Sequence, residues 1–330
     1  MERSTKRMST GWSPNSNADR RSLGASLLRL ARPHQWIKGL FCFIGPLYGG
    51  KLGETQATLA AVGAFVVFGL VSSAGYVVND LRDWEADRAH PRKRRRPVAV
   101  GDVSPAQAGW FAAVLLVAAV AALGLVWGAG GTGGERATAL VALLAGIYVA
   151  NVMSYSLALK HRVIIDVISL ALGFVLRVLA GCAAVLVVPS TWLLNVTFFI
   201  AMFLAFGKRL GERRTMGDDA AAARLVQAKY TDELLRMVVV VTGVATLLTY
   251  AGYIQSQEFG FTRGFNLLWL TMLPATYGLL RCIVLLERGD YDDPTELAAK
   301  DRAFQVAVVV FVGLTVGLRV ILHGVSAGPG

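Results

Sequence analysis

Apolar blocks of about 20 residues recur along the whole chain, and this feature constrains the fold more than any other. An α-helix of that length spans the roughly 30 Å hydrocarbon core of a bilayer. Hydrophobic residues make up 55% of the 330 residues and charged residues only 17%. This composition excludes intrinsic disorder and an ordinary soluble domain, in which about 25% of residues are charged. Short alternating segments typical of a β-barrel do not occur. The sequence therefore predicts an all-α, polytopic membrane protein.

Nine membrane-spanning segments can be drawn from the apolar blocks. They are residues 35–51, 57–79, 104–128, 137–159, 163–187, 190–210, 235–256, 265–287 and 302–323. The first segment is short and contains Pro46, so we expect it to be tilted or broken. The polar residues 1–25 are expected to form a flexible cytoplasmic tail, residues 26–324 the transmembrane domain, and residues 325–330 a short C-terminal tail.

Basic residues gather in alternate loops, and the formal net charge is +11. The loops rich in basic residues contain Arg82, Arg88, Arg92, Lys93, Arg94, Arg95, Arg96, Lys160, Arg162, Lys208, Arg209, Arg213, Arg214, Arg224, Lys229 and Arg236. The opposite loops hold little more than Lys51, Arg136 and Arg263. The positive-inside rule places the N-terminus and the basic loops in the cytoplasm, and nine spans then place the C-terminus outside. Because the basic residues alternate with apolar spans, we expect no nucleic-acid partner.

Oxygen-bearing side chains cluster where the second predicted span ends, in the stretch from Asn79 to Asp87. Each helical residue turns by about 100°, so Asp83, Asp87 and Asp80 fall about 40°, 80° and 100° from Asn79. Three carboxylates in one wedge repel each other and favour a hard cation such as Mg²⁺. Asp83 and Asp87 lie at its centre and are the first candidates for ligands. The alternative is a solvated helix end whose acids pair with neighbouring arginines.

This spacing resembles the first signature of the UbiA superfamily of intramembrane prenyltransferases, in which it binds Mg²⁺ and a diphosphate. Most members carry a second aspartate pair on the matching later loop. Here that loop runs from Tyr155 to Arg162 and contains Lys160, followed by the single acid Asp166. A lysine neutralises phosphate directly, so we expect bound metal to be supplemented by cationic contacts.

The chain is similar, over most of its length, to one branch of this superfamily, the decaprenyl-phosphate phosphoribosyltransferases. The similarity includes residues 32–38, the stretch from Asn79 to Pro97, residues 159–161, Leu176-Arg177 and residues 207–209. It implies a helical bundle whose central cavity opens to the cytoplasm and laterally to lipid. It also implies Mg²⁺-dependent transfer of 5-phosphoribose from phosphoribosyl pyrophosphate to a long polyprenyl phosphate. The setting would be the plasma membrane of a bacterium, where the product feeds cell-wall arabinan synthesis.

The resemblance also suggests roles for individual residues. Asp83, Asp87 and Lys160 are the expected catalytic residues, and Asn79 and Asp80 are expected to support the metal. The donor phosphates would meet Lys38, Tyr155, Lys160, Lys208 and Arg209. Arg177 and Asp166 are weaker candidates for lining the cavity or meeting the lipid phosphate.

Two other functions remain open at this point. One is a conventional UbiA-type enzyme that joins a prenyl diphosphate to an aromatic acceptor, against which the missing second carboxylate pair speaks. The other is a transporter without enzymatic activity, which would show repeats and ionisable groups near the midplane. The sequence leaves the prenyl chain length, the number of Mg²⁺ ions and the oligomeric state undecided.

Overall fold

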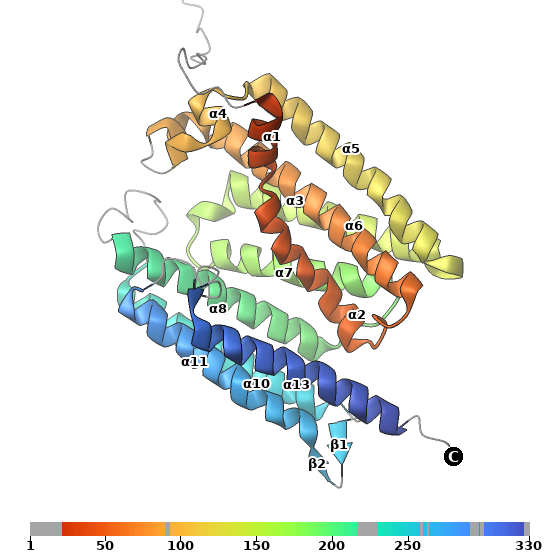
Figure 1. Ribbon diagram of the computed structural model, residues 1–330. Coiled ribbons are helices and arrows are strands. Elements are labelled where there is room, and N and C mark those ends of the chain that lie inside the picture. The colour runs from red at the N-terminus through yellow and green to blue at the C-terminus, as the bar shows by residue number, and fades with distance from the viewer. Residues whose placement is uncertain are drawn as a thin grey trace, which may run out of the picture.

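The computed structural model describes residues 22–89, 93–216, 230–257, 260–262, 264–290, 297 and 300–326 (Figure 1). Its first half comprises α1 (Leu23–Ala31), η1 (Pro33–Phe43), α2 (Ile44–Tyr48), α3 (Thr55–Ala89), η2 (Lys93–Arg95), α4 (Pro97–Val100), α5 (Pro105–Ala129), η3 (Gly131–Gly133), α6 (Gly134–Leu157), η4 (Leu159–His161) and α7 (Ile165–Ala184). Its second half comprises α8 (Thr191–Met216), α10 (Asp232–Gln255), β1 (Phe261–Thr262), β2 (Phe265–Asn266), η7 (Leu267–Thr271), α11 (Met272–Arg288) and α13 (Arg302–Ser326).

The described residues are almost entirely helical, apart from the short antiparallel hairpin of β1 and β2. Eight of their helices are long and apolar enough to cross a membrane. These are α3, α5, α6, α7, α8, α10, α11 and α13, and they coincide with the second to ninth predicted spans. Large apolar side chains also face outward, as Trp110, Val117 and Val120 do on α5, with exposures of 75%, 70% and 68%. The expected membrane helices are therefore present.

The first predicted span has a different form. Residues 33–43 form a 3₁₀-helix, and α2 continues it for five residues around Pro46. A 3₁₀-helix rises about 2.0 Å per residue and an α-helix about 1.5 Å, so η1 and α2 together extend over roughly 30 Å. This segment also starts earlier than predicted, because α1 begins at Leu23, inside the expected tail.

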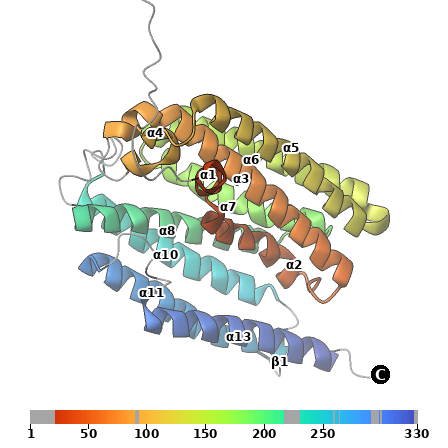
Figure 2. The ribbon, with the colours of Figure 1, turned by 45° about the horizontal axis from the view of Figure 1, so that its top comes forward.

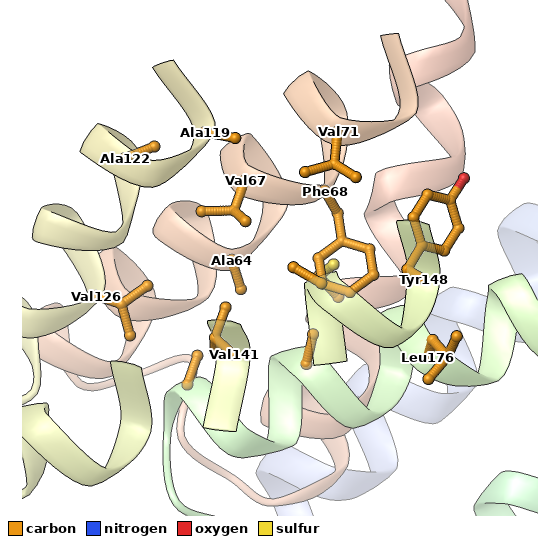
Figure 3. Packing of buried hydrophobic residues seen from close by; sticks show 14 of the residues in the cluster. Ala64, Val67, Phe68, Val71, Ala119, Ala122, Val126, Val141, Tyr148 and Leu176 are labelled. Atoms are coloured by element: carbon orange, nitrogen blue, oxygen red, sulfur yellow. The ribbon is translucent and has the colours of Figure 1, made fainter. Parts of the chain in front are cut away.

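The helices form two groups that lie side by side (Figures 1 and 2). The first contains α3, α5, α6 and α7, and its core packs Phe68, Val71, Val141 and Leu176 among small alanines (Figure 3). The second contains α8, α10, α11 and α13, with a separate core that includes Phe203. Small residues in the first core let the helix backbones approach closely, as is typical of membrane bundles.

Local sequence signals explain several helix boundaries. Ser104 caps α5 by accepting a hydrogen bond from the Gln107 amide, while the Gln107 side chain accepts one from the Ser104 amide. Pro105 follows at the first helical position, where its missing N–H costs nothing. Gly289 ends α11 at a positive φ of 75°, which glycine adopts without strain.

An apolar cavity of about 300 Å³ lies between η1, α2 and the helices of the second group. Its walls include Phe41, Ile200, Phe203, Leu247 and Phe311. None of the predicted site residues lines this cavity, and the central cavity open to the cytoplasm and laterally to lipid stays a prediction.

Candidate functional site

The acidic cluster lies on the last turns of α3. This helix runs to Ala89, ten residues beyond the predicted end of the span, so Asn79, Asp80, Asp83 and Asp87 belong to one continuous helix. Their angular relationship is therefore the one that helical geometry requires. The four side chains nevertheless differ in burial and in partners, and this divides the cluster into two parts.

Asp80 is the structural member of the cluster. Its side chain is 1% exposed. The Arg32 Nη2 atom donates to both carboxylate oxygens, at 2.6 and 2.8 Å, and Arg96 Nη1 lies 2.9 Å from Oδ1. Arg32 sits where α1 ends, so the pair fixes the chain entering the membrane to the end of α3. Two guanidinium groups contact its oxygens, so Asp80 helps to hold the end of α3, and its support of a metal ion stays a prediction.

Arg96 joins the buried acid to its neighbour. Its Nη1 atom donates to Asp87 Oδ2 at 2.7 Å as well as contacting Asp80. The Asp87 side chain is 4% exposed. A charge-assisted contact of this kind removes much of the repulsion between two neighbouring carboxylates. Asp87 therefore lies at the inner edge of the cluster, beside a cation.

Asp83 is the most accessible of the three acids, with a side-chain exposure of 28%. Both of its oxygens lie 2.9 Å from Lys160 Nζ, which comes from η4, 77 residues further along the chain. Nearby, Ser156 on α6 donates to Asn79 Oδ1 at 3.3 Å. The structure thus brings together Lys160 and the acidic face of α3, and this joint region is the candidate site.

The donor chemistry of this site suits a hard divalent cation. Asn79, Asp83 and Asp87 present oxygen atoms at intervals of one helical turn, and oxygen is the ligand type that Mg²⁺ prefers. In the described part of the chain, no group of three or more His, Cys, Asp or Glu side chains is placed so that it could hold a metal ion by itself. A magnesium ion here would take its remaining ligands from phosphate oxygens and water, which is its usual behaviour in proteins.

A second polar cluster is fully buried beside the site and was only partly foreseen. Asp166 on α7 is 0% exposed and accepts hydrogen bonds from Arg209 Nη2 at 3.0 Å and from the Tyr230 hydroxyl at 2.7 Å. Arg209 is 2% exposed. Burial, together with the bond to Asp166, raises the pKa of Tyr230 above its ordinary value. Each side chain is enclosed in this cluster. The contact of Arg209 with donor phosphates stays a prediction, as does the place of Asp166 at the cavity or the lipid phosphate.

Arg177 lies deep in the first helix group and is 5% exposed. Its guanidinium donates to the Gly173 carbonyl at 2.7 Å, to Ser72 Oγ at 2.9 Å and to the Tyr148 hydroxyl at 2.8 Å. It also lies over the rings of Tyr148 and Phe174, at 4.6 and 5.7 Å. These contacts join α3, α6 and α7. Arg177 is not among the residues that line the apolar cavity.

Lys38 lies on η1, and its contact with the donor phosphates stays a prediction. Its neighbours Trp36 and Gly39 approach Gly69 and Phe65 on α3. These positions precede Asp83 by 14 and 18 residues, or about 21 and 27 Å along the helix.

Tyr155 and Lys208 remain half-buried candidates on the last turns of α6 and on α8. Arg32, Arg96 and Tyr230 are contributors to which the sequence analysis assigned no role in the site. Arg32 directly precedes Pro33, and Arg96 precedes Pro97, and both adjacent prolines mark the turns that carry these arginines. Four of the basic residues named in the sequence analysis lie outside the described residues: Arg92, Arg224, Lys229 and Arg263. Most residues of the two expected tails also lie outside them.

Comparisons with known proteins agree with this architecture. A protein named decaprenyl-phosphate phosphoribosyltransferase from Mycolicibacterium smegmatis is 34% identical over 91% of this chain and 94% of its own length. A relative of the same name from Corynebacterium glutamicum is 34% identical over 88% of this chain and 86% of its own.

The fold has solved counterparts as well. The structure of a UbiA homolog from Archaeoglobus fulgidus, bound to GPP and Mg²⁺, superposes with a TM-score of 0.62. The match covers 89% of this chain and 99% of that one, at 18% identity. The family model of the UbiA prenyltransferase family matches residues 40–316. The chain belongs to the UbiA prenyltransferase family.

Proposed function

We propose that this protein transfers 5-phosphoribose from phosphoribosyl pyrophosphate to a long polyprenyl phosphate and releases pyrophosphate. Relatives that cover about nine-tenths of the chain carry the name decaprenyl-phosphate phosphoribosyltransferase, which supports this reaction. The observation that carries the proposal is the contact between Asp83 and Lys160. It places a carboxylate and a lysine at one site. A donor with several phosphates needs both, because the carboxylate can bind a metal ion and the lysine can contact a phosphate directly.

The acidic and basic residues of the site have different proposed roles. Asn79, Asp83 and Asp87 would hold Mg²⁺, and Lys160 would contact a donor phosphate directly, with Tyr155 and Lys208 at the same rim. When bound, the ion neutralises the negative charge that develops on the departing pyrophosphate. Lys160 is 20% exposed. Its ammonium group can therefore leave the Asp83 carboxylate and form an ion pair with an incoming phosphate instead. Asp80, Arg32 and Arg96 hold the end of α3 in place during the reaction.

The chemical step needs no general base from the protein. An oxygen of the acceptor phosphate bonds to C1 of the ribose, while the bond from C1 to the pyrophosphate oxygen breaks and pyrophosphate leaves with the electron pair. The acceptor is a phosphate monoester whose second pKa is about 6, so it is already mostly ionised near pH 7. Attack from the face opposite the leaving group inverts the α-anomeric donor to a β-linked product.

The apolar cavity of about 300 Å³ supplies the lipid side of the site. Its aromatic and aliphatic walls suit the first part of an isoprenoid chain, and the rest would lie in the bilayer. We place the N-terminus and the site in the cytoplasm and the C-terminus outside a bacterial plasma membrane, with η1 and α2 as the ninth crossing. The basic loops support this orientation. The product would be a precursor of cell-wall arabinan.

An assay of substrate choice tests the proposal against its rival, an enzyme that prenylates an aromatic acceptor. Detergent-purified protein is offered labelled phosphoribosyl pyrophosphate with polyprenyl phosphate and, separately, labelled geranyl diphosphate with 4-hydroxybenzoate. We expect an organic-extractable labelled product from the first pair alone, and only when Mg²⁺ is present. Product from the second pair alone would replace the proposed function with the rival. No product from either pair, in protein that keeps its fold, would favour a transporter.

A further inference from the structure

The connection between α6 and α7 carries Lys160, and its backbone is strained four residues later. Ile164 has a φ of 69° and a ψ of −46°. The Ile165 amide donates to the Val163 carbonyl at 2.8 Å, so residues 163–165 form a γ-turn of the rare positive-φ type. A β-branched residue is an outlier at positive φ and persists there only when surrounding contacts hold it.

Tyr230 supplies such a contact from a distant part of the chain. Its hydroxyl accepts a hydrogen bond from the Ile164 amide at 2.7 Å and donates one to Asp166 Oδ1 at 2.7 Å. The side chain is 1% exposed, and its ring packs edge-on against Phe206, with 6.2 Å between ring centroids. Ring packing and the bond to Asp166 together fix the direction in which the hydroxyl oxygen points at the strained turn.

The backbone between Lys160 and Ile164 is itself hydrogen-bonded. The Arg162 amide donates to the Leu159 carbonyl at 3.0 Å, and the Asp166 amide donates to the Arg162 carbonyl at 3.0 Å. A shift of the turn at Ile164 therefore moves the short 3₁₀-helix that presents Lys160. The geometry links the position of the Lys160 ammonium, opposite Asp83, to the Tyr230 hydroxyl.

We propose that Tyr230 is a positioning residue that holds the strained turn at Ile164 and so aligns Lys160 for the donor phosphates. The alignment of Lys160 for the donor rests on the proposed function. The contact by which Tyr230 holds the turn at Ile164, called the clamp below, does not. Tyr230 is needed because the backbone at position 164 is strained. A residue at position 164 that adopts positive φ without strain should therefore make the Tyr230 hydrogen bond unnecessary. Glycine is that residue.

A double-mutant cycle with Tyr230→Phe and Ile164→Gly tests the role in catalysis. Loss of one buried hydrogen bond corresponds to about a fivefold effect, so Tyr230→Phe should raise the KM for phosphoribosyl pyrophosphate about fivefold. The KM for polyprenyl phosphate should stay within about twofold, because Lys160 is assigned to the phosphates of the donor. In the Ile164→Gly background, the same tyrosine change should raise the donor KM less than about twofold. Equal increases in both backgrounds would overturn the role through Ile164.

Hydrogen exchange provides a readout that needs no activity. In substrate-free protein in detergent, the peptide covering residues 158–165 should exchange faster in Tyr230→Phe than in the parent. The control is Ser104→Ala, which removes the cap of α5 and touches neither the turn nor the site. It should lower the melting temperature without changing that peptide. Unchanged exchange in Tyr230→Phe would refute the clamp, even in an active enzyme. A parent protein that transfers no phosphoribose would refute the proposed function instead, and exchange would still decide on the clamp.

Discussion

At the scale of single residues, burial separates side chains that the sequence motif makes look equivalent. Asp80 and Asp83 are three positions apart on α3, yet their side chains are 1% and 28% exposed. Asp80 is held by arginines from two other segments, whereas Asp83 meets Lys160 at the accessible rim. The two acids therefore have different roles, one structural and one directed at ligands, and substitutions should distinguish them.

Asp80→Asn should destabilise the protein more than Asp83→Asn. The change leaves Arg32 and Arg96 without the buried carboxylate that both contact. Loss of one partner of a buried ion pair costs about 3–5 kcal/mol, and we expect roughly 2–4 kcal/mol here because each arginine is about one-quarter exposed. Thermal unfolding in detergent measures the difference. Equal melting temperatures for the two variants would contradict the division of roles.

Lys160→Ala should weaken binding of the donor more than binding of the lipid. Hydrogen bonds to charged groups contribute about 1.5–3 kcal/mol, so the KM for phosphoribosyl pyrophosphate should rise at least about tenfold. The matched control is Arg94→Ala, which removes an exposed cation from the basic loop without touching the acidic cluster. Kinetics with each substrate varied in turn provide the measurement. An unchanged donor KM with normal kcat would exclude the role.

At the scale of elements, the long apolar helices could be predicted from the sequence because an apolar stretch in lipid has few alternatives to a helix. The first segment could not, since its 3₁₀ form depends on tertiary packing. At Gly181 on α7, an added Cβ would fall on the Cys42 carbonyl of η1, so the two segments touch through their backbones.

The acidic face of α3 was predictable from helical periodicity. Its partners Arg32 and Arg96 were not predictable, and neither was the contact between Tyr230 and Asp166, because long-range pairing is not encoded in local spacing.

Gly181→Ala should destabilise the protein, since the new methyl group displaces η1 from α7. The matched control is Gly146→Ala on α6, where an added Cβ meets nothing within 4 Å. In a helix, that control should be neutral or stabilising by up to about 1 kcal/mol. Melting temperatures of the two variants in the same detergent test the contact. A Gly181→Ala protein as stable as the control would show that η1 does not pack against α7 in this way.

At the scale of the whole molecule, the site and the basic loops share one side. The ends of α3, α6 and α8 that carry Asp83, Tyr155 and Lys208 lie together (Figure 1). The positive-inside rule predicts that this side is cytoplasmic. A highly charged soluble donor cannot cross a bilayer unaided, so the proposed reaction requires the same orientation. Two independent arguments thus lead to one topology.

Cysteine labelling at the two ends of α6 tests that topology. In a background without Cys42, Cys182 and Cys282, a cysteine replaces Ala158 after the helix or Thr132 before it, and both positions are exposed. Position 132 should react with a membrane-impermeant thiol reagent in intact cells. Position 158 should react only after the inner face is opened. The reverse pattern would overturn both the orientation and the proposed donor.

The proposed function requires phosphoribosyl transfer at the rim of α3. Mass spectrometry of the lipid product tests it most directly, with purified protein, Mg²⁺, phosphoribosyl pyrophosphate and polyprenyl phosphate. The parent should form a lipid heavier by one phosphoribosyl group, with one pyrophosphate released for each. Asp83→Asn and Asp87→Asn should each lose at least about a hundredfold in rate, which corresponds to about 2.7 kcal/mol of transition-state stabilisation. Asp83→Asn should keep the stability of the parent, whereas Asp87→Asn also loses the buried contact with Arg96 and is assayed below its own melting temperature. Near-normal product formation by both variants would contradict the account.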